Sequence, residues 1–177
     1  MYPMDDGEQL DFGDCRFTRI NGHHTIPRRS DRHLLRESAV FESMRKAYPI
    51  NDSYARLMPN GFWDFSNFFF ETADNTRVLF WGGGVDHVDI QKAKAFRPDV
   101  LLIQIPSNPA EKMAEFVKDV GAPIVIPHHQ DSYLVSGHVD QMMAEYGRMV
   151  EMANPASKFL PLEPGTWYGL QKEVSLL

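Results

Sequence analysis

The sequence predicts an α/β fold: a mixed sheet with flanking helices. Short apolar, β-rich runs alternate with amphipathic helical segments in the second half of the chain, as in parallel strands joined by helices. In the first half, apolar residues on both sides of the turn Gly13-Asp14 indicate a hairpin, which adds antiparallel pairing. With 177 residues, of which 43% are hydrophobic, the chain is expected to form a single domain over residues 1–177.

Local patterns place the individual elements. Strands are expected in a hairpin over 7–20, then at 67–71, 77–81, 100–105 and 124–126, with a turn at Asp74-Asn75 between the second and third of these segments. Helices are expected over 31–47, from a cap at Ser107 or Asn108 to the stop at Gly121, and over 139–153. The apolar faces of the last two helices are predicted to be buried, namely Met113, Phe116, Val117 and Val120, and Met142, Met143, Tyr146, Met149 and Val150.

Composition excludes several classes of partner and compartment. A net charge of -6 argues against nucleic acid, because phosphate binding needs a surplus of Lys and Arg. No apolar run approaches the roughly 20 residues of a membrane span, and the N-terminus lacks the features of a signal peptide. The single cysteine, Cys15, rules out an internal disulfide framework and fits a structural role in a strand. We therefore expect a cytoplasmic protein with neither a membrane nor a nucleic-acid partner.

Histidines gather where predicted strands end. Five of the seven lie in three such loops, which contain His23-His24, Asp86-His87 and His128-His129-Gln130-Asp131. Ligands of α/β sheets collect at the carboxyl ends of the strands, and imidazole beside carboxylate is a common set of ligands for hydrolytic zinc. The pattern predicts descent from a metal-binding site. The alternative is that these polar side chains only hydrogen-bond to one another where the loops meet.

Two other catalytic patterns have little support. Gly82-Gly83-Gly84 lacks the Lys-Ser/Thr of a phosphate-binding loop, so tight-turn glycines after a buried strand are the simpler interpretation. The chain also has no G-x-S-x-G elbow, which argues against a serine hydrolase.

The order of these motifs resembles the metallo-β-lactamase superfamily, especially its ascorbate-6-phosphate lactonase-like branch. The resemblance runs from Asp6 to Leu170 and covers only the C-terminal half of that family's fold, an αββα sandwich. It is carried by Gly22-His23-His24-Thr25, by the strand ending in Gly82-Gly83-Gly84, by Pro98-Asp99-Val100, and by Pro127-His128-His129 before Asp131. It implies a hydrolase of the lactone, ester or phosphoester class, acting on a small-molecule substrate with zinc, manganese or iron.

The chain departs from the family at two places. The His-x-His-x-Asp-His motif is absent, and Gly83 stands where the resemblance implies a metal-bridging aspartate. The implied ligands that remain are His24 and His129, with His23 and His128 as alternates. A rebuilt site would add Asp86 or His87, with Asp131 as a further alternate, to reach the three protein ligands of a catalytic metal.

Two function classes follow. The first is a metal-dependent hydrolase, complete only with the rebuilt site or with a missing N-terminal half. The second is a non-catalytic half-fold that acts as an assembly or binding module. Half a sandwich leaves one sheet face bare, and the aromatics at Phe62, Trp63, Phe65, Phe68, Phe69 and Phe70 supply apolar surface for such a face. We therefore expect a homodimer, unless these rings form the core of one sheet.

Overall fold

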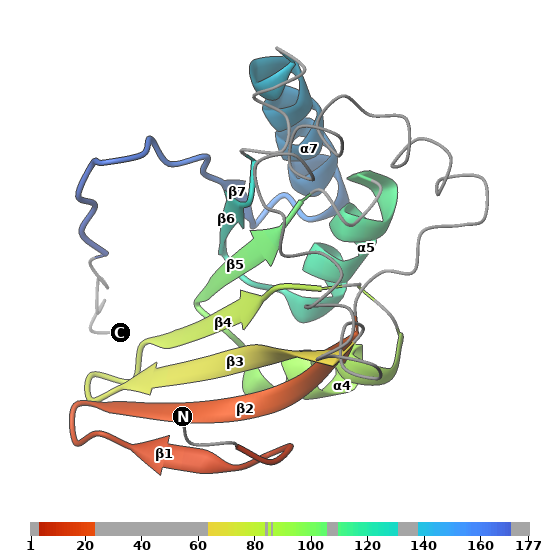
Figure 1. Ribbon diagram of the computed structural model, residues 1–177. Coiled ribbons are helices and arrows are strands. Elements are labelled where there is room, and N and C mark those ends of the chain that lie inside the picture. Colours follow the sequence, from red (N-terminus) through yellow and green to blue (C-terminus); the bar gives the residue numbers. More distant parts are fainter. Residues whose placement is uncertain are drawn as a thin grey trace, which may run out of the picture.

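The computed structural model describes residues 4–23, 64–83, 85, 87–105, 110–130 and 138–170. Their strands form one sheet in chain order, β1 to β7 (Figure 1). Strands β1 to β4 pair antiparallel, and β4 to β7 pair parallel. The predicted α/β class with a mixed sheet is confirmed.

The element bounds follow the sequence patterns closely. The strands are β1 (Gln9–Asp11), β2 (Cys15–His23), β3 (Asp64–Thr72), β4 (Arg77–Trp81), β5 (Val100–Gln104), β6 (Ile124–His128) and β7 (Lys158–Phe159). The helices are α4 (His87–Phe96), α5 (Ala110–Val120) and α7 (Val139–Ala153). The predicted helix over 31–47 and the predicted cap at 107–109 lie outside the described residues.

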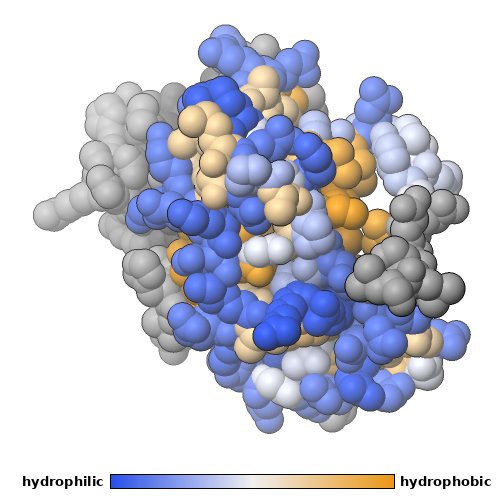
Figure 2. All heavy atoms as spheres, turned by 180° about the vertical axis from the view of Figure 1, so that it is seen from behind, coloured by the Kyte–Doolittle hydropathy of each residue, from blue (hydrophilic) through white to orange (hydrophobic). Residues whose placement is uncertain are grey.

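The three described helices lie on one face of the sheet (Figure 1). Each connects two neighbouring parallel strands, and right-handed crossovers that advance in one direction place their helices on the same side. Their buried residues meet Leu79, Trp81, Leu101, Ile103 and Val125 of the central strands in one core. Seen from behind, the molecule is mainly hydrophilic over these helices (Figure 2).

The predicted helix faces are confirmed. Met113, Phe116, Val117 and Val120 of α5 are all buried, and α5 ends where Gly121 adopts a left-handed backbone with φ of 75°. In α7 the residues Met143, Tyr146 and Val150 are buried, whereas Met142 and Met149 pack at the margin of the core.

Helix α4 was not predicted, because its core-facing residues are few. Ile90 and Ala93 are buried, and Phe96 at its last turn stacks on Phe69 of β3 with ring centroids 4.0 Å apart. One large residue and one alanine give only a weak helical periodicity. The two-residue strand β7 was missed for the same reason, since it is too short to show a period.

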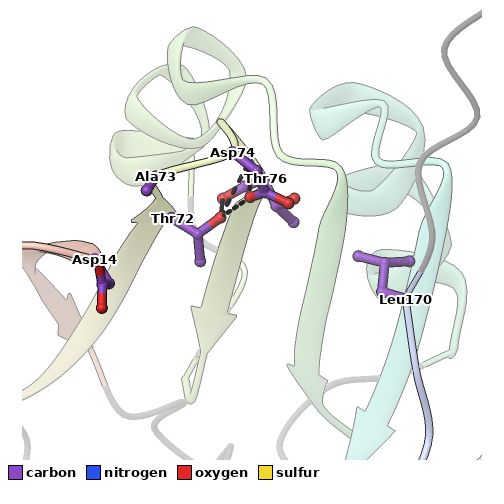
Figure 3. A pocket seen from close by; sticks show the side chains of 6 residues that line it. All are labelled: Asp14, Thr72, Ala73, Asp74, Thr76 and Leu170. Carbon is purple, nitrogen blue, oxygen red and sulfur yellow. Dashed lines mark hydrogen bonds between the residues drawn. The ribbon is translucent and has the colours of Figure 1, made fainter.

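Polar side chains stabilise the turns at the amino end of the parallel strands. In the turn between β3 and β4, Thr72, Asp74 and Thr76 hydrogen-bond to one another around a shallow hollow that Leu170 also lines (Figure 3). These three residues therefore direct hydrogen-bonding groups into the turn itself.

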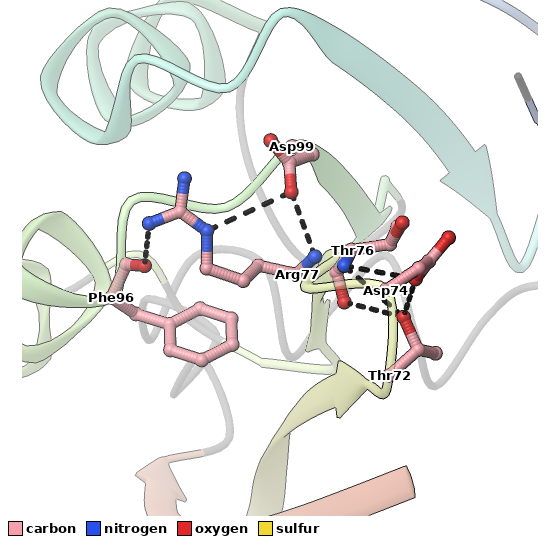
Figure 4. Close-up of polar contacts among 6 residues, drawn as sticks. All are labelled: Thr72, Asp74, Thr76, Arg77, Phe96 and Asp99. Carbon is pink, nitrogen blue, oxygen red and sulfur yellow. Dashed lines mark hydrogen bonds and ion pairs between the residues drawn. The ribbon is translucent and has the colours of Figure 1, made fainter. Parts of the chain in front are cut away.

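The same end of the sheet fixes the C-terminus of α4. The backbone N–H of Arg77 donates to the Asp99 carboxylate at 2.7 Å, and the Arg77 guanidinium donates to the carbonyl of Phe96 at 3.3 Å (Figure 4). A cation at a helix C-terminus compensates the unsatisfied carbonyls there.

No helix among the described residues is both long and apolar enough to cross a membrane.

Candidate functional site

The predicted site lies at the edge where the carboxyl ends of β2, β4, β5 and β6 meet. Strand β2 is antiparallel to β3, and β3 is antiparallel to β4, so β2 and β4 run in the same direction. Strands β5 and β6 continue that direction by parallel pairing. The expectation that His23, His87 and His128 belong to one edge of the sheet is therefore confirmed for the backbone.

His128, the last residue of β6, is the best-defined polar side chain of this edge. Its side chain lies on the sheet face opposite the helices, because the buried residues of β6 are Val125 and Pro127. Its ring stacks on Phe80 of β4 with centroids 4.7 Å apart and an interplanar angle of 16°. Its Nε2 lies 3.2 Å from the carbonyl oxygen of Trp81. The imidazole therefore bridges from β6 to β4 and fills a structural position.

The surroundings of His128 fix its protonation. A carbonyl oxygen only accepts, so the hydrogen bond to Trp81 places the proton on Nε2 and leaves the lone pair on Nδ1. Burial lowers the pKa of His128, and the Trp81 carbonyl opposes that shift without cancelling it. The neutral ring is the form that can bind a metal, and with the proton on Nε2 the ligating atom would be Nδ1.

His129 differs from its neighbour in backbone and exposure. It has a left-handed backbone with φ of 65° and an exposed side chain, whereas His128 is extended and half-buried. Left-handed geometry costs a non-glycine residue about 1–2 kcal/mol. The carbonyl of His128 accepts the N–H of Ile105 at 3.3 Å, which ties β6 to the end of β5 at this point. His129 is therefore an exposed side chain at the edge of the sheet.

Asn67 is a residue of this edge that the sequence analysis missed. It is fully buried in β3 beside Ile20, and its side-chain oxygen accepts the N–H of Gly82 at 2.9 Å. Its side-chain nitrogen has no hydrogen-bond partner within the described residues. Asn67 thus fixes the start of the glycine loop after β4. The signal was a polar residue at an inward-facing position of an aromatic strand.

Several predicted ligands are outside the described part of the chain. His24, Asp86 and Asp131 are among the residues not described, and the side chains of His23 and His87 are not described either. Within the described residues, no group of three or more His, Cys, Asp or Glu side chains could hold a metal.

Strand spacing separates the predicted ligands into near and far pairs. Strands β4 and β6 are two spacings apart, about 10 Å, which His128 shows that one side chain can bridge. Strands β2 and β6 are four spacings apart, or about 19 Å. Metal ligands lie only about 2 Å from the ion. The end of β4 is therefore a nearer source of partners for His129 than the end of β2.

Comparison with known proteins adds no assignment to this geometry. No protein-family model matches the chain, and no curated protein matches it.

Proposed function

We propose that the chain takes part in metal-dependent hydrolysis of a lactone, ester or phosphoester, as a partial metallo-β-lactamase-type fold. His129 is the proposed ligand for zinc, manganese or iron, with Asp86 or His87 from the end of β4 as the nearest partner. His24, at the far end of the edge, is the third candidate. A bound divalent metal would supply Lewis-acid polarisation of the substrate's carbonyl or phosphoryl oxygen.

The observation that carries the proposal is the shared edge. Four strand ends that contain or precede the predicted ligands run in one direction, and an exposed imidazole, His129, follows the last of them. The helices on one sheet face also fit half of an αββα sandwich. Of the predicted ligands, only His128 and His129 have described side chains, so a third ligand must come from the undescribed side chains or from another chain.

Metal content tests this proposal. Protein purified without an affinity tag should retain roughly one equivalent of zinc, manganese or iron by mass spectrometry, and His129→Ala should lose it. His138→Ala is the matched control, because His138 is an exposed histidine at the start of α7 and not a proposed ligand. Chelation should abolish turnover of a lactone, ester or phosphodiester panel. Wild-type protein with less than roughly a tenth of an equivalent would refute the proposal for this chain.

A second candidate function is a non-catalytic assembly module. It is favoured by the sheet face opposite the helices, which carries mainly apolar side chains that remain partly exposed. A protein that binds no metal but associates through this face would have this second function.

A further inference from the structure

The sheet face opposite the helices forms a continuous apolar surface, which we call the open face. Along each strand, alternate residues point away from the helices, and on this side most of the described ones stay at least partly exposed, whereas Val100 of β5 is buried. Its partly exposed apolar members include Phe17, Phe68, Phe70, Val78, Phe80, Leu102, Ile124 and Ile126. None of the described helices packs on it (Figure 1).

Aromatic rings run across the strands of the open face. Phe17 of β2 contacts Phe68 and Phe70 of β3 with centroid distances of 4.7 and 4.8 Å. Phe68 lies 6.4 Å from Phe80 of β4, which in turn stacks on His128 of β6. Aromatic residues in such a cluster are typical of the buried centre of an interface.

The open face is nearly free of charge. Among its described strand residues, the ionised side chains are Arg19 of β2 and Lys158 of β7, which pairs with Ile124. The Arg19 guanidinium donates to the Ser66 hydroxyl and the Met4 carbonyl, both at 2.7 Å. These two cations lie on β2 and β7, toward the two sides of the open face, so the aromatic cluster itself offers a strongly acidic or basic partner no opposite charge. The same uncharged centre of a second copy is not repelled, although the chain's net charge is -6.

The area of the open face matches a second sheet as the binding partner better than it matches a short peptide. Five strands at about 4.8 Å spacing, each about 17–30 Å long, give roughly 400–700 Å² in projection. Side-chain relief raises the accessible area above that value. Stable complexes bury about 800 Å² per partner, which a surface of equal extent supplies and a short segment does not.

We propose that a second copy of this chain packs on the open face, sheet against sheet. The pair is a four-layered α/β/β/α sandwich with a two-fold axis, its sheets about 10 Å apart and its helices on the outside. Two self-complementary faces then bury the same aromatic cluster from both sides. This inference does not depend on a metal.

Sedimentation velocity of the full chain tests the pairing. Wild-type protein should be a dimer at micromolar concentration, and Phe68→Glu should raise the dissociation constant at least about 30-fold. Met152→Glu is the matched control, because Met152 is an exposed apolar residue on α7, away from the open face. It should leave the dimer intact. A wild-type monomer, or a dimer that tolerates Phe68→Glu, would overturn the proposal.

A second measurement covers the case in which Phe68→Glu does not fold. Hydroxyl-radical footprinting of the wild-type chain across a dilution series should show Phe17, Phe70 and Phe80 becoming more reactive as the dimer dissociates. Met152 should react equally at all concentrations. Phenylalanine reactivity that does not change with dilution would contradict the proposal, because the open face would then be covered within a single chain or not at all.

Discussion

His128 offers the sharpest test of whether a predicted ligand is a structural residue. Replacing it with alanine removes the hydrogen bond to the Trp81 carbonyl, worth about 0.5–1.5 kcal/mol, and the stacking on Phe80, worth a similar amount. The free energy of unfolding should therefore fall by about 1–3 kcal/mol. His128→Phe keeps a ring over Phe80 and loses the hydrogen bond, so it should lose about 1 kcal/mol.

Urea unfolding followed by circular dichroism, without added metal, measures these losses. His138→Ala is again the control and should lie within about 0.5 kcal/mol of wild type, as expected of an exposed residue. An unfolding free energy for His128→Ala that is equally close to wild type would refute the structural role. The imidazole would then be free to serve as a ligand.

The pH dependence of the unfolding free energy tests the same structural role of His128 independently. Burial lowers the pKa of His128 in the folded state below its ordinary value of 6.5. Between the folded and unfolded pKa values the unfolded chain binds more protons, so stability falls as the pH drops below 6.5. The difference in unfolding free energy between wild type and His128→Phe should therefore shrink from about pH 8 to about pH 5. A constant difference would contradict the buried neutral ring.

Two further substitutions test the packing of α7 and the backbone at the edge. Gly147→Ala would place a Cβ 3.0 Å from the Phe159 ring, and the overpacking cost of about 1–3 kcal/mol should exceed the helix-propensity gain of about 1 kcal/mol. In a Phe159→Leu background the same change should become stabilising, a reversal that a double-mutant cycle by urea unfolding would detect. His129→Gly relieves a left-handed backbone and should stabilise by up to about 1 kcal/mol, so a loss of that size in the same assay would contradict it.

The sequence predicted the helices whose inward faces carry several large residues. Phe116 and Val117 of α5 and Tyr146 and Val150 of α7 are buried as their spacing indicates. Helix α4 covers the sheet with Ile90 and Ala93, which are too few to define a period. The helices that bury many large apolar side chains were predicted from the sequence, and the helix that buries few was not.

Strand periodicity failed to separate the two faces of the sheet. Phe68, Phe69 and Phe70 are consecutive and predicted a strand, which is correct. Only Phe69 faces the helices and is buried, whereas the other two lie on the open face. A strand that is apolar on both sides shows no alternation, so which ring belongs to the core depends on where the helices pack. The predictions for Phe62, Trp63 and the Phe65 side chain concern parts that are not described.

Strand order connects the two proposals. The end of β2 lies about 19 Å from the end of β6 along the sheet, whereas a second sheet packed on the open face lies only about 10 Å away. With the two-fold axis along the strands, the partner's carboxyl edge would be nearer to His129 than this chain's own His24. Metal content and dimerisation would then be lost together in Phe68→Glu. Retention of metal by the monomeric variant would instead assign the ligands to one chain, with His129 completed from the end of β4.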